Sequence, residues 1–283
     1  MRISVKFDQC FNYSELEQLW RTADRLGFQA LWDYDHFLGP KEHTDPTYEG
    51  WTTLAAMAAV TQRARIGCLV SGVTHRNPAI LAKMAVTVDH ISGGRLNFGI
   101  GAGWHEAEHR GYGIDFPDPG ARVAMVDEAL TVIRRLWTEE SVTFSGRFFT
   151  LERALCEPKP LQRPHPPIVV GGTKPEMLRV IARHADIWNM SGHEGPEGWG
   201  AVNARLDQVC ADMARPPAEV LRSAQLPLHP VEPDQVDEQL ALLPAFEQLG
   251  CAHMVLAFRQ PPTAALLERC RALDSDVRPI AGV

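Results

Sequence analysis

The chain has 283 residues, of which 45% are hydrophobic and 22% are charged, a composition typical of globular proteins. Its formal net charge of −7 and the lack of a lysine or arginine block argue against nucleic acid or a membrane surface as partner. No stretch approaches the roughly 18 apolar residues of a membrane helix. Charged residues interrupt the first eight residues, which does not fit the apolar stretch of a signal peptide. The six cysteines are widely scattered and form no Cys-x-x-Cys pair. We therefore expect a cytoplasmic protein with reduced thiols.

The first half of the chain alternates short apolar strands with amphipathic helices. Strands are predicted at 3–7, 28–32 and 65–70, and in the glycine-rich stretch that begins at 95. The first helix follows the capping-box pattern Ser14-Glu-Leu-Glu17 and stops at Gly27. Further helices are predicted at 51–60, from 78 to the glycines at 93 and 94, and at 123–137.

The pattern is interrupted between Ser141 and Pro167 and then resumes. Residues 142–149 resemble a hairpin, and prolines crowd the segment 158–167, so we expect an insertion that runs over the surface. Strands are predicted at 167–170, 185–190, 221–228 and 253–258, and helices at 177–184, 197–213, 236–249 and 263–273.

Repeated alternation of strand and helix predicts a parallel sheet, and eight such units over about 250 residues predict a closed (β/α)8 TIM barrel. We expect one domain over residues 1–283, with the hairpin and proline-rich insertion between the fourth and fifth βα units. The alternative, an open doubly wound sheet, would place Gly-x-Gly-x-x-Gly after its first strand. Here the glycines follow the fourth strand, which favours the barrel.

The stretch from Arg95 to Glu106 carries the strongest functional signal. Gly99, Gly101 and Gly103 recur at every second position, and because strand side chains alternate between faces, they leave one face bare. We interpret this as a surface for a flat ligand, with tight packing at a barrel corner as the alternative. Trp104, His105 and Glu106 follow at the end of the strand where barrel enzymes place their chemistry.

Asp35-His36 follows the second predicted strand. A histidine titrates near neutral pH and can give or take a proton there. A position at the C-terminal end of a barrel strand favours a catalytic role. The alternative is a histidine whose ring is satisfied by neighbouring backbone groups.

Gly171, Gly172 and Thr173 follow the fifth predicted strand and open a helix. Free N–H groups and the dipole at a helix N-terminus suit an anion such as a phosphate, and Lys174 adds positive charge. The spacing of Thr173 and Glu176 also fits a capping box, so a capped helix without a ligand is the alternative.

His105-Glu-Ala-Glu-His109 matches the His-Glu-x-x-His motif of zinc proteases. Two histidines four residues apart share one helix face, and Glu128 offers a third ligand. Gly111 and Gly113 interrupt the helix directly afterwards, and a five-residue match arises easily by chance. We therefore expect no metal site and keep a zinc hydrolase as a minor alternative.

Four motifs in order resemble the luciferase-like monooxygenase superfamily, and more narrowly its branch that uses the deazaflavin coenzyme F420. They are Asp35-His36-Phe37, Gly72-Val-Thr-His-Arg-Asn-Pro-Ala79, Gly99-Ile-Gly-Ala-Gly-Trp-His-Glu106 and Pro167-Ile-Val-Val-Gly-Gly-Thr173. The resemblance implies a (β/α)8 barrel, usually a homodimer, with the coenzyme at the C-terminal ends of the strands. The implied reaction is hydride transfer between the deazaflavin and a small organic substrate.

The resemblance also implies site residues. Those expected to bind the coenzyme are Asp35, His36, Leu69, Val70, Ser71, Gly101, Ala102, Gly103, Trp104, Gly171, Gly172 and Thr173. His36 aligns with the histidine beside the ring and is the predicted catalytic residue, with His75 and His105 as rivals. Glu106 is the second catalytic candidate if the fold buries it. A non-proline cis peptide or a β-bulge is expected within Leu69–Ser71.

One departure from the family concerns the substrate. Sugar-phosphate dehydrogenases of the family carry a glutamate where Trp104 stands here, which indicates a less polar organic substrate. The alternatives to an F420-dependent oxidoreductase are a flavin mononucleotide (FMN) monooxygenase of the same superfamily and a coenzyme-binding protein without catalysis.

Overall fold

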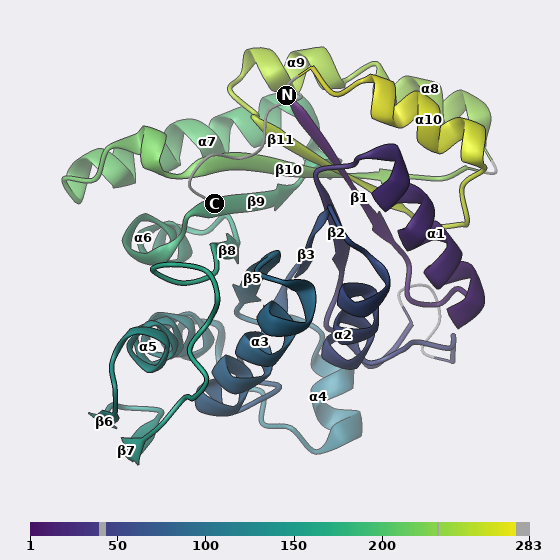
Figure 1. Cartoon of the computed structure of the whole chain (residues 1–283). Coiled ribbons are helices and arrows are strands. Elements are labelled where there is room, and N and C mark those ends of the chain that lie inside the picture. The colour runs from purple at the N-terminus through teal and green to yellow at the C-terminus, as the bar shows by residue number, and fades with distance from the viewer. Residues whose placement is uncertain (40–43, 231, 276–283) are drawn as a thin grey trace.

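The computed structural model describes residues 1–39, 44–230 and 232–275. Within these ranges nine strands form one sheet in the order β3-β2-β1-β11-β10-β9-β8-β5-β4. An additional parallel pairing of β3 with β5 closes the sheet into a barrel (Figure 1), and the short β4 pairs with β5 further along, in continuation of β3. The strands of the sheet are β1 (Arg2–Phe7), β2 (Ala30–Asp33), β3 (Arg65–Cys68), β4 (Ser71–Gly72), β5 (Leu96–Gly101), β8 (Ile168–Gly171), β9 (Ile187–Ser191), β10 (Leu221–Leu228) and β11 (His253–Phe258).

Helices pack around the outside of this ring, so the predicted (β/α)8 fold is confirmed. They are α1 (Tyr13–Leu26), α2 (Gly50–Val60), α3 (Pro78–Ser92), α4 (Glu106–Tyr112), α5 (Pro119–Thr138), α6 (Pro175–His184), α7 (Gly195–Asp212), α8 (Pro233–Leu240), α9 (Leu243–Gln248) and α10 (Ala264–Ala272). The helix predicted at 236–249 is two helices. Pro244 has no N–H to donate to the backbone carbonyl of Leu240, and its ring would clash with that carbonyl in a continuous helix. The predicted loop up to Gly50 includes residues 40–43, outside the described ranges.

The cap predicted for the first helix is wrong. The helix begins at Tyr13 with Asn12 as its N-cap, and the Asn12 backbone N–H donates to the Glu15 carboxylate at 3.2 Å. The capping box therefore lies two residues earlier than Ser14 and Glu17, and helix ends are the least regular part of a sequence pattern.

The predicted insertion lies between α5 and β8, where β6 (Val142–Ser145) and β7 (Thr150–Ala154) form an antiparallel hairpin. Glu128 of α5 holds its turn by accepting hydrogen bonds from three backbone N–H groups, those of residues 147, 148 and 149. The proline-rich return is tied to α3 through Asp89, which accepts from the Leu161 N–H at 2.8 Å. Figure 1 shows the hairpin at the outer end of α5, away from the barrel.

Strand side chains alternate between a large outer core under the helices and a smaller core inside the ring. The inner cluster contains Ala30, Trp32, Leu69, Val169, Ile187 and Val255. The interior also holds a polar chain, since His253 lies 2.6 Å from Ser4 Oγ and 2.9 Å from Ser223 Oγ. Its members are buried, and their mutual hydrogen bonds engage both ring nitrogens of His253.

The six cysteines are unpaired, in agreement with the prediction of reduced thiols. Cys68 is fully buried in β3, where it was expected to be a small core residue. Among the residues described, no helix is both long enough and apolar enough to cross a bilayer.

Candidate active site

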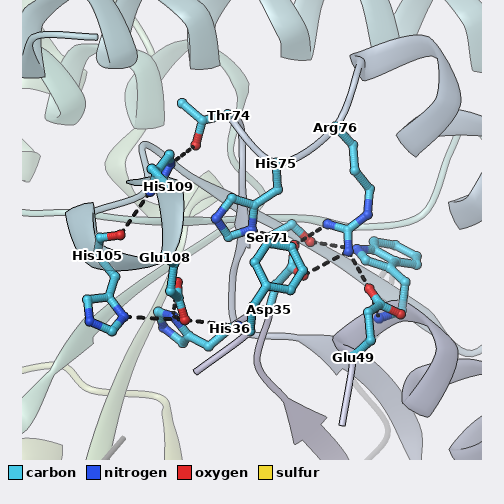
Figure 2. Close-up of polar contacts among 12 residues, drawn as sticks. Asp35, His36, Glu49, Ser71, Thr74, His75, Arg76, His105, Glu108 and His109 are labelled. Carbon is cyan, nitrogen blue, oxygen red and sulfur yellow. Dashed lines mark hydrogen bonds and ion pairs between the residues drawn. The ribbon is translucent and has the colours of Figure 1, made fainter. Parts of the chain in front are cut away.

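The site centres on His36, which follows β2 at the C-terminal end of the barrel. Its Nδ1 lies 3.1 Å from Oε1 and 3.0 Å from Oε2 of Glu108 (Figure 2). An ionised carboxylate only accepts hydrogen bonds, so Nδ1 carries the proton in this pair. The side chain is 28% exposed, and no described residue is hydrogen-bonded to Nε2. His36 therefore offers Nε2 outward while the carboxylate fixes the ring.

Glu108 lies on α4, and its side chain is fully buried. It also accepts the backbone N–H groups of Phe37 at 2.9 Å and Leu38 at 3.0 Å, and His105 Nδ1 lies 3.3 Å away. Burial by itself opposes ionisation. The hydrogen bond and charge of His36, with the two N–H donors, outweigh it and lower the pKa of Glu108 to about 2. Glu108 thus joins the loop after β2 to α4.

Glu106, the predicted second catalytic residue, does not reach this site. Its side chain is 61% exposed and pairs with Arg110 at 2.8 Å. Residues two apart point to different sides of a helix, so the turn that buries Glu108 turns Glu106 to solvent. The spacing of His105 and Glu108, three residues apart on one helix face, is the signal that could have identified the carboxylate that lies in this cluster.

The lowered pKa of Glu108 predicts a loss of stability in acid. Because the pKa falls from 4.5 to about 2 on folding, the ionised carboxylate stabilises the fold above pH 4.5. That contribution, up to about 3 kcal/mol, is lost as the pH falls toward 2. The free energy of unfolding should therefore differ between the wild type and Glu108→Gln at pH 7, and the gap should shrink by pH 3. A gap that stays constant down to pH 2 would show that the carboxylate charge does not stabilise the fold.

Asp35, predicted to contact the coenzyme, is buried in an ion-pair network behind the site. Arg76 binds both of its oxygens, at 2.5 and 3.0 Å, and also pairs with Glu49. His75 Nδ1 lies 3.6 Å from the same carboxylate. Burial opposes ionisation of Asp35, but the hydrogen bonds of His75 and Arg76 keep its pKa below the ordinary value. The Asp35 carboxylate is directed inward and holds the loop that carries His36.

The two rival histidines differ in position. The His75 side chain is 3% exposed and packs against the Phe37 ring with centroids 4.7 Å apart. His105 is 17% exposed and stacks on Trp104 at 4.9 Å. His105 therefore remains a rival for proton transfer, whereas His75 belongs to the buried network behind the loop.

The zinc-protease set is not assembled. His109 is buried and bonds Thr74 Oγ1 at 2.7 Å and the His105 carbonyl at 2.9 Å, while Glu128 holds the hairpin turn. A different trio, His36, His105 and Glu108, has ligand atoms within 4.8 Å of one another. Its carboxylate already accepts two backbone N–H groups and the His36 N–H, so the carboxylate that would have to bind an ion is engaged in hydrogen bonds.

The predicted backbone distortion is present: the Leu69–Val70 peptide bond is cis. The Val70 side chain covers the glycine row, by which we mean Gly99, Gly101 and Gly103. A Cβ on Gly101 would lie 2.8 Å from Val70 Cγ2. A Cβ on Gly99 would lie 1.9 Å from the Cys68 carbonyl oxygen. Gly99 and Gly101 thus allow tight packing, and the interpretation that they face a ligand directly is wrong. The surface at this place is the partly exposed Val70.

The other residues expected at the coenzyme differ in exposure. Leu69 and Ser71 are buried, and Ser71 Oγ accepts from Trp51 Nε1 at 2.9 Å. Ala102 and Gly103 are partly exposed, and Trp104 is 70% exposed with its ring centroid 5.5 Å from that of His36. Val70, Ala102, Gly103 and Trp104 therefore form the accessible edge of the site; we call them the Val70–Trp104 edge.

Gly171 ends β8, Gly172 and Thr173 follow it, and all three are partly exposed. The predicted cap is wrong, since α6 has Lys174 as N-cap without a side-chain hydrogen bond. Gly172 has a structural role, because its φ is 144° and a Cβ there would lie 2.5 Å from Met177 Cγ. Substitution of Gly172 will therefore cost stability as well as any binding. No described residue accepts the backbone N–H of Gly172 or Thr173, so both can donate to an anion.

Fold and site together define an α/β-barrel protein with a paired histidine and carboxylate beside an accessible aromatic edge. The family model described as luciferase-like monooxygenase matches residues 3–269. The chain therefore belongs to the luciferase-like monooxygenase family, an oxidoreductase superfamily, as the sequence motifs predicted.

Two curated relatives illustrate the range of the family. An uncharacterized protein of Mycobacterium tuberculosis (strain ATCC 25618 / H37Rv) is 37% identical over 150 residues, 53% of this chain and 52% of the relative. The FMNH2-dependent dimethylsulfone monooxygenase of Pseudomonas putida is 28% identical over 198 residues, 70% of this chain and 53% of the relative. The chain spans about half the length of these relatives.

Among solved structures, an F420-dependent secondary alcohol dehydrogenase in complex with an F420-acetone adduct is similar, with a TM-score of 0.83. The two chains are 18% identical, and the match covers 98% of this chain and 100% of the other. At this identity the likeness supports the fold, and both deazaflavin and flavin enzymes occur among the similar proteins.

Proposed function

We propose that the protein is an F420-dependent oxidoreductase that transfers a hydride between the deazaflavin and a small organic substrate. The observation that carries this proposal is the His36–Glu108 pair, which presents Nε2 of His36 beside the Val70–Trp104 edge. Reduction of a carbonyl, or oxidation of an alcohol, moves a proton together with the hydride. A positioned histidine is suited to that proton.

The residues present fit such a coenzyme. Val70, raised above the glycine row, offers an apolar platform for a flat ring, and Trp104 stands exposed at its side. The unpaired N–H groups of Gly172 and Thr173 suit a phosphate. When bound, F420 supplies a hydride acceptor or donor at its deazaflavin ring. The chain itself supplies the platform, the anion site and the proton.

His36 manages the proton in this proposal. Glu108 accepts the Nδ1 proton and so keeps Nε2 available to give a proton to a substrate oxygen, or to take one from it, according to the direction of reaction. The same carboxylate holds the backbone of residues 37 and 38, so the ring is fixed by the loop as well as by its own hydrogen bond.

An FMN-dependent monooxygenase is the second candidate, favoured by the FMNH2-dependent relative of Pseudomonas putida. A coenzyme-binding protein without catalysis would bind one of these molecules and show no turnover. The homodimer, the cytoplasmic location and the small organic substrate inferred from the sequence remain part of the proposal.

Titration of the purified protein with F420 and separately with FMN, followed by fluorescence, tests the choice of coenzyme. F420 is expected to bind at least about tenfold more tightly than FMN, a difference of about 1.4 kcal/mol. Tighter binding of FMN, with oxygen consumption on reduction, would replace the deazaflavin proposal by the monooxygenase. Binding of neither would remove both.

A further inference from the structure

Trp104 differs from the other tryptophans of the chain, because it is 70% exposed. The other six are at most 2% exposed: Trp20, Trp32, Trp51, Trp137, Trp188 and Trp199. A single exposed apolar residue is common on a protein surface and needs no explanation by itself. Trp104 needs one because its ring contacts His36 and His105 of the candidate active site.

One face of the Trp104 indole is covered by His105. The two rings are stacked, with centroids 4.9 Å apart and an angle of 19° between their planes. The Nδ1 atom of His105 lies 3.3 Å from the buried carboxylate of Glu108, which also accepts the His36 N–H. The carboxylate that fixes His36 therefore also supports the ring on which Trp104 rests, and the indole is held in place before a ligand binds.

The opposite face of the indole is open. The ring centroids of Trp104, His105 and His36 form a triangle with sides of 4.9, 5.5 and 6.0 Å. Because the two imidazoles lie so close to each other, they cannot lie on opposite faces of the indole. Among the described residues no further ring or cation contacts Trp104. The free face can therefore stack on a flat ligand.

His36 lies beside the same indole, with an angle of 70° between the two ring planes. Its Nε2 atom has no hydrogen-bond partner in the described part of the chain. Stacked aromatic rings prefer an offset arrangement with centroids roughly 4.5 to 7 Å apart. A ring offset toward His36 on the free indole face would bring a group attached directly to that ring toward Nε2.

We propose that the substrate is a small aromatic carbonyl compound or the corresponding alcohol, and that Trp104 selects it by stacking on its ring. This inference rests on the proposed function, because it takes His36 to handle the proton. In the direction of reduction, the carbonyl carbon accepts a hydride from the reduced coenzyme, and the carbonyl oxygen accepts a proton from His36. The alcohol forms as the coenzyme is oxidised.

Binding of aromatic compounds and their saturated partners tests the inference without coenzyme. The probes are acetophenone with cyclohexyl methyl ketone, and benzyl alcohol with cyclohexylmethanol, measured by ligand-observed NMR on the full chain. The saturated partners are at least as apolar, so burial alone gives no preference for the aromatic ring. At least one aromatic probe should bind the wild type roughly 2- to 10-fold more tightly than its partner.

Two substitutions of Trp104 and one control assign this preference to the indole. Trp104→Leu should abolish the preference, and Trp104→Phe should retain part of it. Because Trp104 is exposed, both variants should keep the thermal midpoint of the wild type. Tyr112→Leu removes another exposed aromatic ring, which contacts Phe37 with centroids 4.8 Å apart, and it should keep the full preference.

Quenching of tryptophan fluorescence by iodide identifies the ring that the ligand covers. Trp104 is the tryptophan that aqueous iodide can reach, since the other six are at most 2% exposed. Benzyl alcohol should reduce the quenching in the wild type more than cyclohexylmethanol does at the same concentration. Trp104→Phe should remove most of the iodide-sensitive fluorescence, with or without the ligand.

Equal affinity of aromatic and saturated partners in the wild type, or an aromatic preference that persists in Trp104→Leu, would overturn the proposal. So would a Trp104 that iodide cannot reach in the free protein, since the indole would then be covered already. A fall in F420 affinity of more than about tenfold in Trp104→Leu would also overturn it, because the indole would then be a coenzyme contact. A Trp104-dependent preference in a protein that binds no F420 would leave the stacking role standing and remove the proposed function alone.

Discussion

Replacement of His36 by glutamine is expected to lower the rate of the chemical step by roughly 100- to 10,000-fold, the usual worth of a positioned proton-transfer group. The coenzyme should still bind within about tenfold, because Val70, Trp104 and the N–H groups after β8 are untouched. The rate is measured in a single turnover, as the oxidation or reduction of bound F420 by a substrate that the wild type converts. Coenzyme affinity is measured alongside by fluorescence.

His105→Gln provides the matched comparison. His105 lies in the same cluster, 3.3 Å from Glu108, and stacks on Trp104. Its replacement therefore tests whether loss of any histidine in this cluster lowers the rate of proton transfer. A much smaller effect than that of His36→Gln is expected. If His36→Gln keeps near-full turnover and His105→Gln does not, the proton passes through His105. If His36→Gln loses coenzyme affinity instead of rate, His36 is a binding residue.

Replacement of Glu108 by glutamine should lower the chemical rate by roughly 10- to 1,000-fold at little cost in coenzyme affinity. The glutamine carbonyl can still accept the N–H groups of Phe37 and Leu38. Its amide, however, can turn toward Nδ1 of His36 and favour the tautomer with the proton on Nε2. Nε2 of His36 would then carry the ring proton and could not take a proton from the substrate. Single-turnover rates measured as a function of pH report this change.

Glu106→Gln is the control, since it makes the same substitution two residues away on the same helix. Glu106 is exposed and pairs only with Arg110 in the described part of the chain, so its loss should leave the rate within about twofold. Equal losses of rate in Glu106→Gln and Glu108→Gln would show that the rate depends on the overall charge of α4 and not on the contact between Glu108 and His36. A full rate in Glu108→Gln would leave His36 to act without the carboxylate.

The barrel could be predicted from the sequence because each part of the signal is local. Alternating apolar residues, glycines at helix ends and the spacing of the units are all recorded along the chain. The same holds for His36, since the residue after a barrel strand lies at the active end whatever its neighbours are. The cis peptide at Leu69–Val70 came from the family resemblance and was confirmed.

The choice between Glu106 and Glu108 was decided by tertiary structure. Both lie on a seven-residue helix that has too few turns to show a hydrophobic face, so its rotation depends on what it packs against. That packing directs Glu108 to the loop after β2 and leaves Glu106 in solvent.

The barrel, its insertion and the histidine after β2 could be inferred from the amino-acid sequence, because these features follow from periodicity and position. What fills the space at Gly99 and Gly101, and what Asp35 contacts, depends on residues far apart in the chain. The Val70 side chain occupies the space at Gly99 and Gly101, and Arg76 reaches Asp35 from 41 positions away. Both contacts join separate strands and loops, and the side-chain directions that create them are fixed by packing across the barrel.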